Sequence, residues 1–206
     1  SHTCAILDDD SIMCWGRGSS GELGNGTNTQ SNTPVAVTLP TGRTATAIAA
    51  GNSHTCAILD DDSVMCWGYN NNGQLGDGTN TQSNTPVAVT LPTGRTATAI
   101  SAGSYHTCAI LDDDSLMCWG LNNNGQLGDG TNTDSNSPVA VTLPTGRTAT
   151  AISAGIYHTC AILDDDSIMC WGYNYYGQLG DGTNTDSNTP ITIWAKIFDI
   201  SSAGRF

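Results

Sequence analysis

The chain has 206 residues, and 19 acidic residues against 6 basic ones give it a net charge of −13. A charge of this sign repels phosphate backbones and anionic lipids, so we expect neither a nucleic-acid partner nor insertion into a membrane. No stretch approaches the roughly 18 consecutive apolar residues that span a bilayer. The start, Ser1-His2-Thr3-Cys4, is neither a signal peptide nor an initiator methionine, which predicts a processed or excised piece.

The chain is a tandem repeat with a spacing of 52 residues, which separates successive histidines, cysteine pairs and tryptophans. We therefore predict one domain built from four repeats, which cover residues 1–52, 53–104, 105–156 and 157–206. The second and third repeats are nearly identical. They differ at six positions, which are Ser53/Tyr105, Val64/Leu116, Tyr69/Leu121, Gln82/Asp134, Thr85/Ser137 and Ser104/Ile156.

Each repeat reads as short strands joined by turns. In the second repeat, HTCAIL (54–59) and SVMCWG (63–68) flank three aspartates and predict a β-hairpin. The next segment, 69–86, is rich in turn-forming Asn and Gly and has no periodicity. Two further strands are expected at 86–91 and 96–103, around a Pro-Thr-Gly turn.

The hairpin has two apolar faces. Pairing Cys56 with Cys66 places Ile58 opposite Val64 on one face, and the other face then carries Ala57, Met65 and Trp67. A sheet that buries both faces lies between other sheets, as in a propeller blade or a stacked solenoid. The fold class predicted is therefore all-β, a propeller-like array of four blades of about four antiparallel strands each.

Every repeat contains a pair of cysteines separated by nine residues. The opposed register brings the two sulfurs of a hairpin within disulfide reach, which predicts one disulfide inside each blade. Zinc is the competing interpretation, but two sulfurs per blade make an incomplete ligand shell. Disulfides in this number are typical of an extracellular or cell-surface protein. The predicted pairs are Cys4–Cys14, Cys56–Cys66, Cys108–Cys118 and Cys160–Cys170.

The segment AGSYHTCAILDDDSLMCWGLNNNGQLGDGT (102–131) and its copies resemble the repeat of the regulator of chromosome condensation family, in a cysteine-containing extracellular variety. The resemblance covers the whole chain and rests on an Ala-Gly-x-x-His strand, a Trp-Gly strand end and an Asn-x-x-Gly-Gln-Leu-Gly loop. It implies a β-propeller, seven-bladed in the best-known members. The functions it implies are binding functions: nucleotide exchange on a small GTPase, ultraviolet sensing and β-lactamase inhibition.

The chain departs from the family pattern at three points: it has four repeats, each repeat has two cysteines, and the hairpin tip has aspartate where glycine is the commoner choice. The tip aspartates are Asp10, Asp62, Asp114 and Asp166. The acidic balance and the lack of a basic tail argue against chromatin binding.

Two repeated sets of polar residues are metal candidates. The histidines His2, His54, His106 and His158 could converge on one axis, although we favour a packing role in which each satisfies neighbouring backbone groups. The Asp-Asp-Asp tips and the segments 129–134 and 181–186 could hold calcium, although solvated turns are the favoured interpretation. We expect no cofactor and no catalytic residue, because known catalytic motifs are absent and identical copies favour structure over catalysis.

The repeats vary most in the loop after the Trp-Gly strand end. This loop carries Tyr69, Tyr173, Tyr175 and Tyr176, which predict a rim that binds a protein or a glycan. The alternative is that these tyrosines pack between blades. Asn25 begins the one Asn-x-Thr sequon and is a candidate glycosylation site.

The last repeat changes at 191–198, which is typical of a terminal or interface repeat. The chain ends in Ala-Gly-x-x, the sequence that precedes His-Thr-Cys in the internal copies, so the two ends complement each other. Ring closure, contact with a second copy and a longer natural array all fit this pattern. The residues expected at an assembly junction are Trp194, Ile197, Phe198 and Phe206.

These observations predict a non-catalytic extracellular repeat protein that self-associates end to end as a structural subunit of a surface layer, fibre or adhesin. The alternative is a protein- or glycan-binding module of the inhibitor or lectin kind. A secreted enzyme has the least support.

Overall fold

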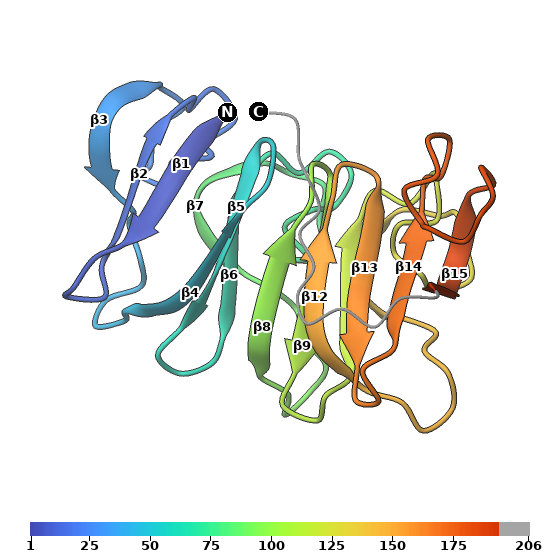
Figure 1. Cartoon of the computed structure of the whole chain (residues 1–206). Helices are drawn as coiled ribbons and strands as arrows, with labels where there is room; N and C mark the ends of the chain where they lie inside the picture. Colours follow the sequence, from blue (N-terminus) through green and yellow to red (C-terminus); the bar gives the residue numbers. More distant parts are fainter. Residues whose placement is uncertain (194–206) are drawn as a thin grey trace.

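The computed structural model describes residues 1–193, and every regular element within them is a β-strand. The strands form four antiparallel sheets, which stand side by side in chain order like the blades of a fan (Figure 1). The all-β, propeller-like array of four blades that the sequence predicts is therefore confirmed. No helix that could span a membrane occurs in this part of the chain.

Blade 1 has three described strands (β1–β3), and blades 2, 3 and 4 have four each (β4–β7, β8–β11 and β12–β15). The strands are β1 (His2–Ile6), β2 (Ile12–Gly16), β3 (Ser31–Ala36), β4 (Ala45–Ala50), β5 (His54–Leu59), β6 (Val64–Gly68), β7 (Ser83–Ala88), β8 (Ala97–Ala102), β9 (His106–Leu111), β10 (Leu116–Gly120), β11 (Ser135–Ala140), β12 (Ala149–Ala154), β13 (His158–Leu163), β14 (Ile168–Gly172) and β15 (Ser187–Ile193).

The blades are offset from the sequence repeats by one strand. We expected the two later strands of a repeat to flank the Pro-Thr-Gly turn, but β7 and β8 lie in different sheets. β8 instead pairs with β9, with Ile100 opposite Ala109 and Ser101 opposite Cys108. The Pro-Thr-Gly segment therefore links one blade to the next. The first strands of adjacent blades contact each other, β4 with β8 and β8 with β12.

The hairpin of each blade has the predicted register. Cys56 lies opposite Cys66 and Ile58 opposite Val64, and the same pairing recurs in the other blades. All four predicted disulfides are present, each with a Cα–Cα distance of 4.1 Å. At the hairpin tip, Asp62 has a φ of 60°. This left-handed conformation explains why glycine is common there and why aspartate, which also tolerates it, can replace glycine.

Among the described residues, three apolar cores lie between adjacent blades and a fourth is formed by blade 4 alone. One core combines Cys56, Ile58 and Val64 of blade 2 with Leu111 and Trp119 of blade 3, and equivalent cores join the other neighbours. A strand in the middle of the array therefore packs on both sides. This arrangement explains the two apolar faces of the hairpin.

A polar link crosses each of these interfaces. The backbone carbonyl of Gln74 in blade 2 accepts hydrogen bonds from Trp119 Nε1 (2.9 Å) and Thr107 Oγ1 (3.0 Å) of blade 3. Glu22 and Gln126 offer the same carbonyl to the blades that follow them. We call this set of contacts the interblade link.

The tryptophan of the interblade link lies flat against a glycine. A Cβ atom on Gly76 would lie 2.7 Å from Trp119 Nε1 and 2.9 Å from Cδ1, so glycine is the residue that fits beneath the indole ring. Gly24 and Gly128 meet Trp67 and Trp171 in the same way.

We expect Gly76→Ala to be more destabilising than Gly94→Ala. Both glycines have a positive φ (67° and 77°), so alanine strains the backbone at either position by about 1 kcal/mol. At Gly76 the added methyl group also collides with Trp119, which costs roughly 1–3 kcal/mol more, whereas nothing lies within 4 Å of a Cβ at Gly94. Urea unfolding followed by tryptophan fluorescence measures both. Equal losses would contradict this packing.

Candidate functional site

The array has two rims that carry different chemistry. Residues 60–62 lead into β6 and residues 69–82 leave it, so the Asp turn and the long loop lie at opposite ends of this strand. We call the four Asp turns the turn rim. The loop rim is formed by the loops after β2, β6, β10 and β14, which are residues 17–30, 69–82, 121–134 and 173–186.

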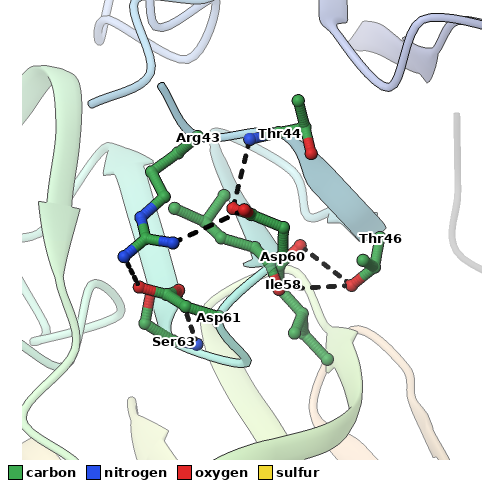
Figure 2. Close-up of polar contacts among 8 residues, drawn as sticks. Arg43, Thr44, Thr46, Ile58, Asp60, Asp61 and Ser63 are labelled. Carbon is green, nitrogen blue, oxygen red and sulfur yellow. Dashed lines mark hydrogen bonds and ion pairs between the residues drawn. The ribbon is translucent and has the colours of Figure 1, made fainter. Parts of the chain in front are cut away.

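On the turn rim, an arginine from the interblade connection binds two aspartates. Arg43 Nη2 lies 2.7 Å from Asp61 Oδ2, and Arg43 Nη1 lies 3.4 Å from Asp60 Oδ2 (Figure 2). The backbone N–H of Thr44 donates to Asp60 Oδ1. Arg95 and Arg147 bind the matching aspartates of blades 3 and 4.

In blades 2, 3 and 4 these contacts occupy the first two carboxylates of each Asp-Asp-Asp turn. Hydrogen bonds from Ser63, chiefly from its hydroxyl, together with Arg43 hold the pKa of Asp61 below its ordinary value. Among residues 1–193, no three His, Cys, Asp or Glu side chains are grouped as a metal site. The turn rim therefore has the contacts of a structural clamp.

The repeated histidines take part in the interblade link. His54 Nε2 lies 2.9 Å from Thr107 Oγ1, whose proton is donated to the carbonyl of Gln74. His54 is therefore the donor and carries its proton on Nε2. We expected the histidines to bond backbone groups directly. The partner of His54 is instead the hydroxyl of Thr107 in the next blade, and that hydroxyl in turn bonds the backbone carbonyl of Gln74. His2 and His106 make the same contact.

Burial keeps these imidazoles neutral. Burial, and to a smaller extent the neighbouring histidines, lower the pKa of His54 and His106 from 6.5 to about 3. The Nδ1 atom of each is buried and has no hydrogen-bond partner among the described residues. A proton at Nδ1 would therefore be an uncompensated buried charge.

Five tyrosines form a continuous cluster on the loop rim of blades 3 and 4. Tyr105 stacks on Tyr157 with 5.6 Å between ring centroids, and Tyr157 meets the edge of Tyr173 at 6.1 Å. Tyr173 contacts both Tyr175 and Tyr176 at 6.3 Å. Tyr175 and Tyr176 are 65% and 80% exposed, so most of their surface faces solvent.

The tyrosine cluster borders a cavity of about 780 Å³, which we call the tyrosine pocket. This volume falls in the range of about 300–1,000 Å³ that ligand sites occupy. Its walls combine aromatic rings with amides and one imidazole, and they include Tyr105, Tyr157, Tyr173, Tyr176, Gln178 and His158. The pocket spans three blades, because Asn72 of blade 2 also contributes.

The rim of tyrosines predicted from the sequence coincides only partly with the tyrosine pocket. Tyr173 and Tyr176 line the pocket, and Tyr175 stacks beside them. Tyr69 lies half-buried in the loop of blade 2 and is not among the lining residues. Sequence reasoning missed Tyr105 and Tyr157, which precede β9 and β13 rather than follow a Trp-Gly strand end. Tyr105 and Tyr157 stack across adjacent repeats, although the alternative of packing between blades concerns the tyrosines of the loop after the Trp-Gly strand end.

The differences between the second and third repeats concentrate at the pocket. Three of the six, Tyr105, Leu121 and Ile156, line it. A fourth, Asp134, accepts a hydrogen bond from Asn72 Nδ2 at 3.2 Å, and Asn72 is a lining residue. This comparison of repeats is the signal that could have found Tyr105.

The sequon asparagine occupies a turn that recurs in every blade. Asn25 Oδ1 accepts hydrogen bonds from the backbone N–H and the hydroxyl of Thr27. In blade 2, Asp77 accepts the equivalent pair from Thr79. Asn25 is half-buried and Thr27 is exposed.

The residues expected at the assembly junction, Trp194, Ile197, Phe198 and Phe206, lie outside the described residues.

Comparison with known families agrees with this architecture. The family model described as the RCC1-like domain matches residues 1–205. The chain therefore belongs to the RCC1-like domain family, as its repeat motifs suggest.

The chain is similar to the Arabidopsis thaliana ultraviolet-B receptor UVR8, with 34% identity over 98% of this chain and 46% of the receptor. It is 28% identical to the human E3 ubiquitin-protein ligase HERC2 over 94% of this chain and 4% of the ligase. Human WBSCR16 shares the fold with a TM-score of 0.89 at 21% identity, over 98% of this chain and 53% of that structure. The chain thus spans about half the length of UVR8 and WBSCR16.

We expect acid to destabilise the protein through the buried histidines. Below about pH 6.5 the unfolded chain protonates these imidazoles and the native chain does not, so the free energy of unfolding falls as the pH falls. The slope is roughly 1.4 kcal/mol per pH unit for each buried histidine until the folded pKa of about 3 is approached.

Urea unfolding between pH 7 and pH 5 measures this slope. His106→Gln keeps a donor for Thr159 but cannot be protonated. The dependence of its unfolding free energy on pH should therefore be smaller by the contribution of one histidine. A slope identical to that of the wild type would show that His106 titrates normally in the folded state.

We expect Asn25→Asp to retain the stability of the wild type within about 0.5 kcal/mol, because Asp77 makes the same turn contacts in blade 2. Asn25→Leu should lose about 1 kcal/mol with those hydrogen bonds. Thermal unfolding measures both variants.

If Asn25 is glycosylated on passage through a eukaryotic secretory pathway, an endoglycosidase-sensitive mass shift should appear in the wild type and disappear in Asn25→Asp.

Proposed function

We propose that this chain is a non-catalytic binding module that contacts a protein partner through the tyrosine pocket. The observation that carries the proposal is that four of the six differences between two nearly identical repeats line the pocket or bond its wall. The two other differences, Val64/Leu116 and Thr85/Ser137, are conservative. Divergence concentrated at one surface is what selection for a specific contact would produce.

The residue types at the pocket suit recognition. Tyrosine offers a large, rigid and amphipathic contact area with little loss of side-chain entropy, and amides add adaptable hydrogen bonds. Tyr175 and Tyr176 project this surface into solvent. A protein of the same fold has a known protein partner, as in the crystal structure of Kap60 bound to yeast RCC1 (Prp20), which is 20% identical to this chain. A likeness at 20% identity shows only a shared fold, so the partner of this chain is inferred from its own pocket.

We place this module outside the cytosol. All eight cysteines are paired, and Cys14, Cys56, Cys66, Cys108 and Cys118 are fully buried in the cores between blades. Disulfides of this number form and persist in oxidising compartments.

The structural or assembly role suggested by the repeats has less support than binding. It is inferred from the near-identical repeats and the complementary ends, and its expected junction residues lie outside residues 1–193, namely Trp194, Ile197, Phe198 and Phe206. The tyrosine pocket lies within the described residues and favours binding. The tyrosines and amides that line the pocket suit recognition, and we assign it no catalytic role.

The test replaces the third repeat's pocket residues with those that the second repeat already uses. The variant Tyr105→Ser, Leu121→Tyr, Asp134→Gln and Ile156→Ser should fold, because each residue occurs at the same position one blade earlier. Peptides selected from a random phage-displayed library on the wild-type chain should bind this variant at least tenfold more weakly.

The matched control is Leu116→Val with Ser137→Thr, which exchanges the other two differing positions. It should bind the selected peptides as the wild type does. Selected peptides that bind all three proteins equally would contradict the assignment of the pocket.

A further inference from the structure

The described surface carries unbalanced negative charge. Arg17 pairs with Glu22 at 3.4 Å, and Arg43, Arg95 and Arg147 are each held by two aspartates of the turn rim. Every arginine among residues 1–193 is thus already neutralised. Eleven aspartates in the same residues are in no ion pair: Asp8, Asp9, Asp10, Asp62, Asp77, Asp114, Asp129, Asp134, Asp166, Asp181 and Asp186.

Two of these aspartates adjoin the tyrosine pocket. Asp134 accepts hydrogen bonds from the backbone N–H of Asn122 (2.7 Å) and from Asn72 Nδ2 (3.2 Å), beside the pocket wall. Asp186 accepts from the backbone N–H of Asn174 (2.7 Å), the residue that follows Tyr173. Blades 1 and 2 have uncharged Gln30 and Gln82 at this position. Blades 3 and 4, which carry the tyrosine cluster, therefore have an aspartate at this position, and blades 1 and 2 do not.

Aromatic faces beside carboxylates attract cations for two independent reasons. The quadrupole of a tyrosine ring presents a negative face to an ammonium or guanidinium group, and the contact is stronger where water is excluded. A neighbouring carboxylate adds Coulomb attraction. An anionic ligand would meet repulsion from Asp134, Asp186 and the net charge of −13.

We propose that the tyrosine pocket binds a basic segment of a partner protein, whose lysine or arginine side chains lie over Tyr157, Tyr173 and Tyr176 next to Asp134 and Asp186. This inference rests on the proposed function and specifies the chemical class of its partner. A neutral glycan would stack on the same rings but would gain nothing from the two carboxylates.

The first experiment compares charged and neutral probes. A fluorescein-labelled tetra-arginine peptide should bind the wild-type chain, and its affinity should fall as salt is raised. A tetra-citrulline peptide has nearly the same shape without charge and should bind at least tenfold more weakly. A neutral maltohexaose should show no comparable affinity.

The second experiment maps the probe to the pocket. Asp134→Gln with Asp186→Gln, which restores the residue of blades 1 and 2, and Tyr173→Leu with Tyr176→Leu should each weaken tetra-arginine binding roughly fivefold. The matched controls are Asp62→Asn with Asp114→Asn, which remove two charges from the turn rim, and Tyr69→Leu, which removes a tyrosine outside the pocket. Both controls should stay within twofold of the wild type.

Equal effects of the pocket variants and the controls would overturn the proposal, because binding would then be unspecific attraction to an acidic surface. Equal binding of citrulline and arginine peptides, or preferred binding of maltohexaose that the tyrosine variants abolish, would also overturn the basic partner. Equal binding of the two peptides would leave the pocket a protein-binding site, so the proposed function would stand, whereas a preference for maltohexaose would replace its protein partner with a glycan. Failure of the proposed function would be seen separately, as equal binding of the phage-selected peptides to the wild type, the pocket variant and the control.

Discussion

The backbone carbonyl of Gln74 is the point on which the array depends. It accepts hydrogen bonds from an indole and a hydroxyl of the next blade, and both donors are buried. A buried donor without an acceptor costs more than a typical hydrogen bond contributes, so Trp119 and Thr107 hold this loop in one position. His54 extends the link by donating to the same threonine. Hydrogen bonding and apolar packing thus act at the same interface.

The loops that supply this carbonyl also build the loop rim. Within the loop of blade 2, the buried side chain of Asn70 donates to the carbonyls of Thr79 and Thr81 and accepts from Leu75 N–H. Asn136 of the next blade donates to the carbonyl of Gly78 on the outer side. Since the loop is held from within and from the neighbouring blade, side chains at its surface can be substituted without moving its backbone. This rigidity explains how nearly identical repeats can carry different side chains at the tyrosine pocket.

The two rims divide the charged residues between structure and recognition. On the turn rim, three arginines of the interblade connections each bind a pair of aspartates and hold the connections against the hairpin tips. The loop rim of blades 3 and 4 contains no arginine among the described residues, so the charges of Asp134 and Asp186 stay uncompensated beside the tyrosines. In three turns of the turn rim an arginine thus binds two of the three aspartates, whereas Asp134 and Asp186 on the loop rim have no arginine beside them among the described residues.

The sequence by itself determined what depends on contacts near in the chain. The period of 52 residues and the Cys56–Cys66 register follow from sequence pattern and turn chemistry, and the structure agrees with both. The tertiary structure alone decided the threonine partners of His2, His54 and His106 and the meeting of Tyr105 with Tyr157, which join residues about one repeat apart. It also decided the sheet of β8, which pairs with β9 and not with β7. The local pattern shows that both faces of the hairpin are apolar, but the packing of whole blades selects the neighbour of each face.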